Sequence, residues 1–390
     1  MSKIFSLFIA LFLISSYAIS APLPTPSITP SAPNSIAKSY VLMDFNSGKI
    51  IAGKNADSRV EPASLTKIMT GYIVINELSM GNIALEDKVT ISKKAWKMPG
   101  SKMFIEVGKK VSVKDLIKGM VIQSGNDASV ALAEHIAGSE DVFAELMNSY
   151  AKKLGMTETH YMNATGLPHE KHYTSASDLA KLTQSLIINF PEEYKWYSQK
   201  KFTFNGITQY NRNKLLWQDK SVDGLKTGHT NSAGYCLVSS AVRNEMRIIS
   251  IVLGTNSAKQ RVAESQKLLN YGFRFFETHK IYDAAQRLDD ARVWEGQKDI
   301  VGLGLTKDLY VTIPRGQYKK LEIETSIKSG ITAKITKGQT LGKLHISLNG
   351  NTIVERPLTA LDDIEEGSFF KKIMDQIKQL FQSILNSIGL

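Results

Sequence analysis

Residues 61–70 read EPASLTKIMT, and this stretch decides how the rest of the chain is interpreted. After Pro62 and Ser64 the apolar residues recur at helical spacing, which predicts a helix over 65–78. Residues three apart share one face at the start of a helix, so Lys67 is expected to lie over Ser64. A base beside a serine hydroxyl can remove its proton, and the stretch therefore indicates an activated nucleophile.

Two further motifs follow in order, SGN at 124–126 and KTG at 226–228. Each motif is weak alone, because the pattern Ser-x-x-Lys recurs at Ser35, Ser149, Ser198 and Ser368. The context separates them, since Ser64 opens a strongly apolar helix while Ser35 and Ser368 lie beside a leader and in a tail. The ordered set inside one domain is far more specific than any single member.

The three motifs give each candidate residue a role. The Lys67 amine is a base only while it is neutral, and burial together with the charge of Lys226 would lower its pKa. Backbone N–H groups beside Ser64 point out of the helix start and can hold an oxyanion. Ser124 is expected to pass a proton to the leaving amine, and Asn126 to bind a substrate amide. Lys226, Thr227 and Gly228, just before a predicted strand at Gly234, offer an edge, a cation and a hydroxyl to a peptide carboxylate.

The composition is that of a globular protein of about two domains. The chain has 390 residues, of which 43% are hydrophobic and 22% charged. The net charge of +11 suits anionic partners, but no basic run is interleaved with aromatics, so nucleic acid is not an expected partner. The single cysteine, Cys236, excludes an internal disulfide and lies in an apolar run, where a buried strand thiol is expected.

The N-terminal residues indicate export. Lys3 precedes the apolar run 4–14, and small residues follow, which is the layout of a signal peptide over 1–21 with cleavage between Ala18 and Ala21. The run is too short to cross a membrane, although an uncleaved N-terminal anchor is the alternative. Residues 22–34 are rich in Pro, Ser and Thr and are expected to be an extended leader. The expected location is periplasmic or on the outer face of the cytoplasmic membrane, attached peripherally.

Residues 35–286 combine strand and helix patterns. A hairpin is expected over 39–51, and strands are expected at 234–242 and 246–252. Further helical patterns lie at 113–123, 128–137, 142–154, 177–188 and 258–276. The predicted fold class is a mixed α/β domain in which N- and C-terminal strands share one sheet around a helical insertion.

From about residue 287 the pattern changes to short β-rich runs separated by Gly and Pro. The runs lie at 309–313, 321–325, 331–334, 344–347 and 352–354. They predict a small all-β domain over 287–362, and no catalytic cluster falls within it.

The tail, 363–390, starts with acidic residues and continues as a helix with one apolar stripe and a fully polar opposite face. Polar residues interrupt the stripe throughout, so the helix is not expected to span a membrane. An amphipathic helix lying on a membrane surface fits the pattern best, and a helix packed on its own protein is the alternative.

The sequence resembles the low-molecular-mass penicillin-binding proteins, in particular the type-5 serine D-alanyl-D-alanine carboxypeptidases. The matching stretches are 61–70 (EPASLTKIMT), 124–128 (SGNDA), 211–213 (NRN), 223–230 (DGLKTGHT) and 272–277 (GFRFFE). The resemblance covers nearly the whole chain, including signal peptide, β-rich domain and tail. It implies a serine β-lactamase/transpeptidase-like domain over 35–286. It also implies removal of the terminal D-alanine from peptidoglycan pentapeptide stems through an acyl-enzyme on Ser64, and covalent binding of β-lactam antibiotics.

The resemblance also implies roles for residues outside the three motifs. The N–H groups of Ser64 and His229 would form the oxyanion hole, and Arg212 would help to orient the substrate carboxylate. Family members often carry an acidic residue near the position of Asn189, where it would steady that arginine. The asparagine in this chain departs from the family pattern.

Two other functions share some of these features. A serine β-lactamase has the same three motifs, but a class A enzyme would need a glutamate where this chain has His160, and the nearest acid, Glu158, lacks an asparagine at the required distance. A non-catalytic wall-binding scaffold would not need the intact motif residues. His160, His169 and His172 have no Cys or carboxylate partner at ligand spacing, so no metal and no cofactor are expected.

Overall fold

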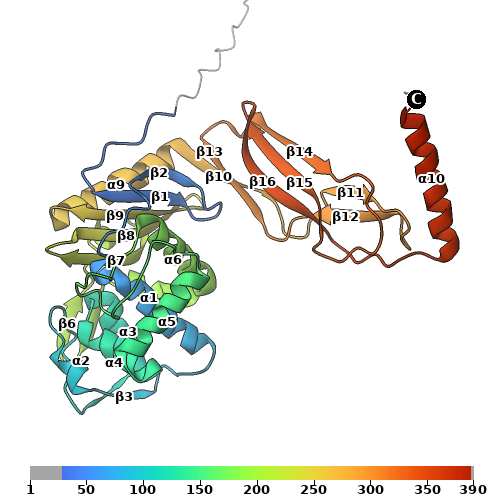
Figure 1. Ribbon diagram of the computed structural model, residues 1–390. Coiled ribbons are helices and arrows are strands. Elements are labelled where there is room, and N and C mark those ends of the chain that lie inside the picture. The colour runs from blue at the N-terminus through green and yellow to red at the C-terminus, as the bar shows by residue number, and fades with distance from the viewer. Residues whose placement is uncertain (1–28, 388–390) are drawn as a thin grey trace, which may run out of the picture.

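The structure is a computed structural model that describes residues 29–387, with side chains up to Phe381. The predicted signal peptide, 1–21, and the leader residues 22–28 lie outside the described residues, as do residues 388–390 of the tail. Figure 1 shows a mixed α/β domain, a β-rich domain beside it and a single helix at the far end. This arrangement confirms the predicted fold class.

The first domain is built on a five-stranded antiparallel sheet. Its strands are β1 (Ser39–Asp44), β2 (Ile50–Lys54), β7 (Val222–Thr230), β8 (Gly234–Arg243) and β9 (Met246–Thr255). The strand order is β2-β1-β9-β8-β7, and Leu42 of β1 lies opposite Ser250 of β9. Strands from both ends of the domain therefore share one sheet, as predicted. Residues 226–228, expected just before a strand, belong to β7, which is itself an edge strand.

Side chains of the sheet enter two hydrophobic clusters, one on each face. Tyr40 and Leu42 of β1 pack under α9 (Ala258–Phe275), whereas Val41 and Met43 face the helical insertion. The alternation matches a strand covered on both faces. Figure 1 shows α9 on one side of the sheet and the insertion, with α1 (Lys67–Ser79) and α6 (Ala176–Asn189), on the other.

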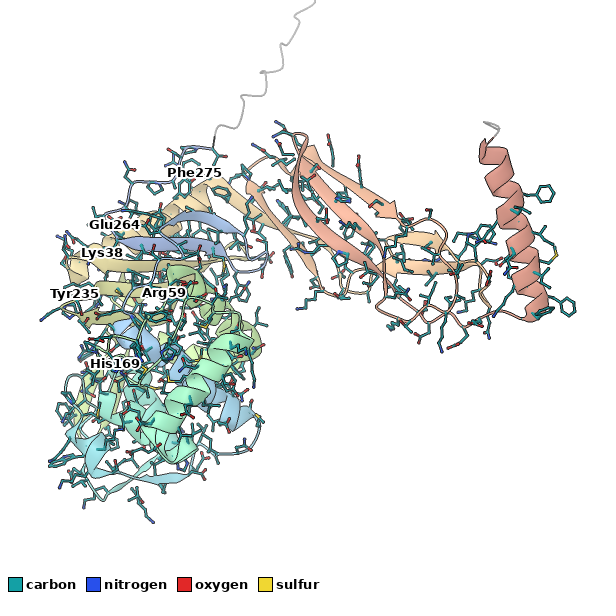
Figure 2. The ribbon with its side chains drawn as sticks, viewed as in Figure 1. Lys38, Arg59, His169, Tyr235, Glu264 and Phe275 are labelled. Atoms are coloured by element: carbon teal, nitrogen blue, oxygen red, sulfur yellow. The ribbon has the colours of Figure 1, made fainter. Side chains whose placement is uncertain are left out.

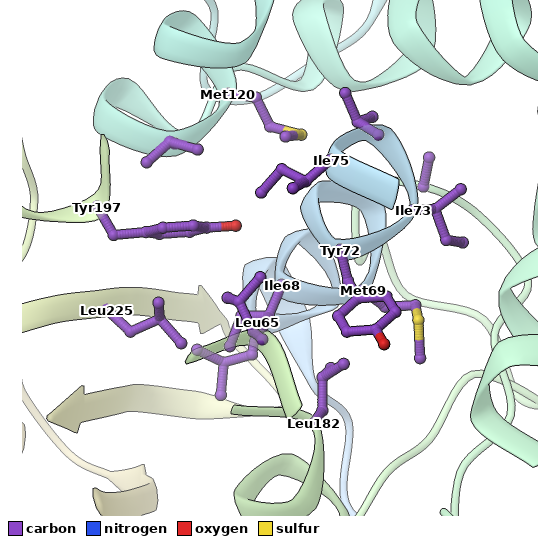
Figure 3. Close-up of a cluster of buried hydrophobic side chains, with 14 of the residues drawn as sticks. Leu65, Ile68, Met69, Tyr72, Ile73, Ile75, Met120, Leu182, Tyr197 and Leu225 are labelled. Atoms are coloured by element: carbon purple, nitrogen blue, oxygen red, sulfur yellow. The ribbon is translucent and has the colours of Figure 1, made fainter. Parts of the chain in front are cut away.

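The insertion runs between β2 and β7 and packs around α1. Every residue from Lys67 to Ile75 is buried, and Figure 3 shows the apolar side chains that surround this helix. A helix that is buried on all sides needs no single apolar stripe. The other elements are the 3-10 turn Ala63–Thr66, β3 (Lys88–Thr90), α2 (Lys93–Lys97), β4 (Lys110–Ser112), α3 (Val113–Lys118), the π-helical turn Gly119–Gln123, α4 (Asn126–Ala137), α5 (Glu140–Lys153), α7 (Pro191–Tyr194), the 3-10 turn Lys195–Ser198, β5 (Lys201–Phe204), β6 (Ile207–Tyr210) and α8 (Leu215–Gln218).

The helix predicted over 113–123 is divided in the structure into α3 and the π-helical turn. A Cβ at Gly119 would lie 2.3 Å from Sδ of Met103, so the helix packs closely against the loop after α2 where the division occurs. The turn ends at Ser124, which has a left-handed φ of 68°. Such wide turns recur at functional sites because they redirect the chain.

The β-rich domain contains two sheets. β10 (Phe276–Tyr282) pairs with β13 (Leu309–Pro314). The second sheet has the order β11-β12-β16-β15-β14 and consists of β11 (Asp289–Arg292), β12 (Ile300–Gly304), β14 (Leu321–Ile327), β15 (Thr340–Leu348) and β16 (Asn351–Ala360). The β-rich architecture thus begins at Phe276 rather than at 287. The run 331–334 is not a strand, because Thr332 makes only an isolated bridge to Trp294 while the buried Ile331 anchors the loop in the core.

The two domains are joined by direct hydrogen bonds as well as by the chain. β10 begins at the residue after α9 ends. Thr278 Oγ1 donates to the buried carboxylate of Asp44 at 2.7 Å, and Lys49 Nζ donates to the backbone oxygen of Thr312 at 3.0 Å. We call these contacts the interdomain joint.

The C-terminal helix, α10 (Phe369–Ser387), lies within the predicted tail and follows its acidic residues. The backbone N–H of Glu295 donates to the buried carboxylate of Asp375 at 2.9 Å, so the first turns of α10 dock on the β-rich domain. Phe370, Ile377 and Phe381 nevertheless remain exposed. No helix within residues 29–387 is long and apolar enough to cross a membrane.

Candidate active site

The nucleophile candidate, Ser64, lies in the 3-10 turn that leads directly into α1. Ser64 was expected at the start of an α-helix. The observed turn is tighter, but it still brings Lys67 Nζ to 3.1 Å from Ser64 Oγ. Ala63 has a φ of 47°, a left-handed conformation that is costly for a residue other than glycine. Gly166 permits close packing behind the turn, because a Cβ there would lie 1.7 Å from the Ala63 carbonyl oxygen.

Lys67 is buried, with 1% of its surface exposed, and makes three polar contacts. Besides the contact with Ser64, its Nζ donates to Asn126 Oδ1 at 2.7 Å and to the backbone oxygen of Thr165 at 2.6 Å. Asn126 is the first residue of α4, and its Nδ2 donates to the backbone oxygen of Pro99 at 2.7 Å. Both amide atoms of Asn126 are therefore engaged within the protein.

The electrostatic surroundings of Lys67 favour the neutral amine. Burial, and then the positive charge of Arg212, lower the pKa of Lys67 to about 7, against the opposing effect of Asp127 and Glu140. The charge expected to act on Lys67 is that of Lys226, and the two lysines do repel each other, while Arg212 is a further cation that lowers the pKa of both. A lysine of this pKa is unprotonated in a large fraction of molecules at neutral pH.

Ser124 and Lys226 form the second pair of the site. Lys226 Nζ donates to Ser124 Oγ at 2.8 Å and to the backbone oxygen of Thr227 at 3.0 Å. Burial, followed by the charges of Lys67 and Arg212, holds the pKa of Lys226 well below its ordinary value. The left-handed conformation of Ser124 aims its hydroxyl at this lysine. The structure thus brings the three predicted motifs together.

The edge strand β7 forms one wall of the site. Lys226, Thr227, Gly228 and His229 follow one another on it. A Cβ at Gly228 would lie 3.0 Å from the backbone oxygen of Pro62, so the glycine allows the strand to approach the nucleophile turn closely. This approach places the backbone of β7 beside Ser64.

A cavity of about 420 Å³ opens between β7 and the insertion. It is lined by Ser64, Gly100, Ser101, Ser124, Arg212, Thr227, Gly228, His229, Tyr235 and Arg261. Figure 2 labels Tyr235, one of these lining residues, at the left edge of the catalytic domain. The cavity therefore contains predicted residues from every motif, together with Arg212.

Sequence reasoning missed four lining residues, of which Arg261 is the most informative. Arg261 is buried on α9, and its Nη1 donates to the backbone oxygen of Gly228 at 3.0 Å. It shares a helix face with the buried Leu268, so a cation within the apolar stripe of α9 was the available signal. Tyr235, Gly100 and Ser101 had no comparable signal in the sequence.

Asn189 forms no hydrogen bond with Arg212 within the described residues. Asn189 ends α6, and its Nδ2 donates to Tyr72 Oη at 2.9 Å. Asn189 is not a lining residue of the cavity. In this chain the residue at this position is therefore a partner of Tyr72.

Glu158 and His172 occupy structural positions. Glu158 Oε2 accepts from Arg59 Nε at 2.8 Å and does not line the cavity, so it offers no counterpart to the water-activating glutamate of class A β-lactamases. His172 Nδ1 accepts from the N–H of Met162, and its Nε2 lies 2.8 Å from Thr66 Oγ1. Burial, followed by the charges of His160 and His169, lowers the pKa of His172 to about 4. Cys236 is a buried thiol on β8, as predicted.

Family comparisons agree with this geometry. The family model of D-alanyl-D-alanine carboxypeptidases, peptidase family S11, matches residues 27–257. The model of the penicillin-binding protein 5 C-terminal domain matches residues 276–366.

Known proteins resemble the chain over most of its length. It is 46% identical to the D-alanyl-D-alanine carboxypeptidase DacA of Escherichia coli K12 over 363 residues, which cover 91% of this chain and 90% of that protein. Penicillin-binding protein 5 from Haemophilus influenzae has a similar structure, with a TM-score of 0.84 and 44% identity over 86% of this chain and 100% of that chain. Penicillin-binding protein 6B from Escherichia coli is similar with a TM-score of 0.71 and 37% identity over 84% of this chain and 96% of that chain.

One assignment follows from three findings. The cavity is lined by the three motifs, a family model matches each domain, and the relatives span the chain. The chain belongs to the S11 family of serine D-alanyl-D-alanine carboxypeptidases and has the architecture of penicillin-binding protein 5.

Proposed function

We propose that the chain performs its D-alanyl-D-alanine carboxypeptidase reaction through an acyl-enzyme on Ser64, with Lys67 as general base. The observation that carries the proposal is the 3.1 Å separation of Lys67 Nζ from Ser64 Oγ, in a buried site where the pKa of Lys67 is about 7. A base is most effective when its pKa lies near the working pH, because it is then both available and strong enough to take the proton.

The contacts of Lys67 orient the neutral amine. A neutral amine has two N–H groups and one lone pair. Asn126 Oδ1 and the Thr165 carbonyl oxygen accept the two N–H groups, which leaves the lone pair for the Ser64 hydroxyl. Asn126, which was expected to bind a substrate amide, is by this argument an orienting residue of the base.

The reaction follows from these positions. Ser64 Oγ attacks the carbonyl carbon of the penultimate D-alanine while Lys67 takes the hydroxyl proton, and the N–H groups of Ser64 and His229 hold the oxyanion. The peptide bond then breaks as Ser124, in contact with Lys226, passes a proton to the nitrogen of the leaving D-alanine, and the proton that Lys67 took restores the Ser124 hydroxyl. Water attacks the resulting ester, releases the shortened peptide and returns a proton to Ser64.

The free carboxylate of the substrate is recognised by the two arginines that line the cavity. Arg212 and Arg261 line the cavity next to the hydroxyl of Thr227. Charged donors bind a carboxylate more strongly than neutral ones. The edge position of β7 leaves backbone groups to pair with an extended peptide. An amide in place of the terminal carboxylate should therefore remove most of the activity.

Intact-mass spectrometry after penicillin treatment tests the nucleophile. The unaltered chain is expected to gain one penicilloyl group on the peptide that contains Ser64, and Ser64→Ala should gain none. Ser149→Ala, which alters the same Ser-x-x-Lys pattern outside the site, is the matched control and should label fully. A label on the peptides of Ser35, Ser149 or Ser198 would contradict the proposal.

We also propose that the protein is exported and is held peripherally on a membrane surface by α10. The support is the set of exposed apolar side chains on this helix, among them Phe370, Ile377 and Phe381. Apolar side chains on one face of a surface helix enter the interface between headgroups and acyl chains. Peptidoglycan pentapeptide and β-lactams are then the ligands of the cavity, and the membrane is the partner of α10.

A further inference from the structure

The cavity has room for only the end of a polymeric substrate. Its volume of about 420 Å³ suits a ligand of small-drug size. A pentapeptide stem attached to a glycan strand is far larger, so most of such a substrate must lie on the surface around the cavity. The residues that border the cavity mouth therefore decide whether the polymer is bound as well as its peptide terminus.

Two segments border the mouth. The loop after α2 contributes Gly100 and Ser101, and the chain after β6 contributes Arg212. The segments are in contact, because Gln209 Nε2 donates to the backbone oxygen of Lys102 at 2.9 Å. Three exposed aromatic side chains lie on these segments or on the ends of the elements that lead into them, and we call them the aromatic rim: Trp96 of α2 (41% exposed), Phe104 of the loop after α2 (52%) and Tyr210, the last residue of β6 (59%).

Phe104 is presented to solvent by a strained backbone. Its φ of 69° is left-handed, which a bulky residue rarely adopts. The N–H groups of Met103 and Phe104 each donate at 3.0 Å to the buried carboxylate of Asp127, the residue after Asn126. The loop is therefore fixed to the catalytic helix α4. The strained backbone of Phe104 exposes an apolar ring, which does not stabilise the fold. Strained backbone conformations are found preferentially at functional sites.

Four lysines that form no ion pair within the described residues accompany the aromatic rim. Lys97 is the last residue of α2 and Lys102 lies in the loop after it, whereas Lys200 precedes β5 and Lys201 is its first residue. Lys94 forms an ion pair with Glu140, whereas these four lysines form no ion pair within the described part of the chain. Peptidoglycan stems carry free carboxylates, so the charge of these lysines is complementary to a polymeric substrate.

We propose that the aromatic rim and these four lysines bind the glycan strand and the neighbouring stems of peptidoglycan, and that polymer-bound pentapeptide is the preferred substrate class. The inference rests on the carboxypeptidase function proposed above. The apolar C–H faces of the sugar rings pack on the aromatic side chains, and the lysines attract the stem carboxylates.

The test compares two substrates with variants of the full chain. The substrates are un-cross-linked glycan strands rich in pentapeptide and a soluble peptide that ends in D-Ala-D-Ala. Phe104→Gly combined with Tyr210→Ala should lower kcat/KM on the strands by about tenfold and leave the soluble peptide unaffected. Phe104→Gly relieves the left-handed strain, so the melting temperature should not fall. Tyr318→Ala, which removes an exposed aromatic of the β-rich domain, is the control and should change neither activity.

Binding is measured separately by co-sedimentation of the Ser64→Ala chain with the same strands. The rim substitutions should release this chain from the strands, and added salt should do so as well, because the lysines act through charge. Equal losses on both substrates, or undiminished binding to the strands, would overturn the inference. Failure of the unaltered chain to release D-alanine from the soluble peptide would instead contradict the carboxypeptidase proposal.

Discussion

The catalytic domain and the β-rich domain differ in where they place charge. The catalytic domain buries charged side chains on several elements, among them Lys67, Asp127, Lys226 and Arg261. Across the described residues 276–368 no Asp, Glu, Lys or Arg side chain is buried. Burial of a charge costs several kcal/mol per ion unless partners compensate. The comparison therefore separates a domain organised for chemistry from one organised for packing.

The largest difference is expected when a lysine is replaced in each domain. Lys67→Met removes the base, so the rate of acylation by penicillin should fall by about a thousandfold or more. Lys343→Met, at an exposed lysine of β15, should leave that rate unchanged. Stopped-flow acylation checks both, with circular dichroism to show that each variant is folded. Acylation of Lys67→Met at the original rate would break the comparison.

A second contrast concerns the membrane. Truncation after Gly367 removes α10, and binding to anionic vesicles should fall by at least about tenfold, because each buried apolar side chain contributes about 1 kcal/mol or more. Turnover of soluble peptides should persist, since the cavity lies in the catalytic domain. Ile377→Asp combined with Phe381→Asp should lower vesicle binding as the truncation does. A truncated chain that pelleted with vesicles as fully as the intact chain would show that α10 only packs on the β-rich domain.

A smaller effect is expected in the pH dependence. Acylation needs neutral Lys67, so its rate should rise with pH through about 7. The charge of Arg212 lowers the pKa of Lys67, so Arg212→Met should move the midpoint of the rise to higher pH. Arg243→Met, which breaks an ion pair with Asp219 elsewhere on the domain, is the control and should leave the midpoint in place. A shift to lower pH would reverse the assigned sign.

The smallest effect is expected for exposed ion pairs of the β-rich domain. Lys343 Nζ lies 2.8 Å from Glu355 Oε1, and both side chains are about half exposed. Lys343→Ala should lower the free energy of unfolding by less than about 1 kcal/mol, because solvent screens such pairs. Urea denaturation measures this change. A larger loss would mean that the β-rich domain depends on charge more than its core indicates.

Much of the fold was predictable because it follows from periodic patterns. The strands β8 and β9 are short, mostly apolar runs and the helices α5 and α9 carry apolar stripes, and local sequence reveals both. β7 was missed because its Lys, Thr and Gly residues obscure the alternation of an edge strand. The segment 331–334 resembled a strand because Ile331 anchors a loop, a long-range effect with no local signature.

The site was predictable where motifs follow one another and not where the fold brings distant residues together. Ser64 and Lys67 are one turn apart, so their contact is local. Arg261 reaches the cavity from α9, and Thr165 reaches Lys67 through its backbone oxygen, which is independent of side-chain identity. The effect of Arg212 on the Lys67 pKa likewise depends on tertiary distance.

The interdomain joint lets the β-rich domain act as a spacer of fixed length. Because Thr278 and Lys49 bond across it, the two domains form one long body, and Figure 1 shows β15 and β16 running along that body toward α10. β16 has 10 residues, which span about 33 Å. With α10 on the bilayer, as proposed, strand length sets the height of the cavity above the lipid. The enzyme would then trim a layer of wall at that height, and an inserted or deleted pair of residues in each long strand would select another.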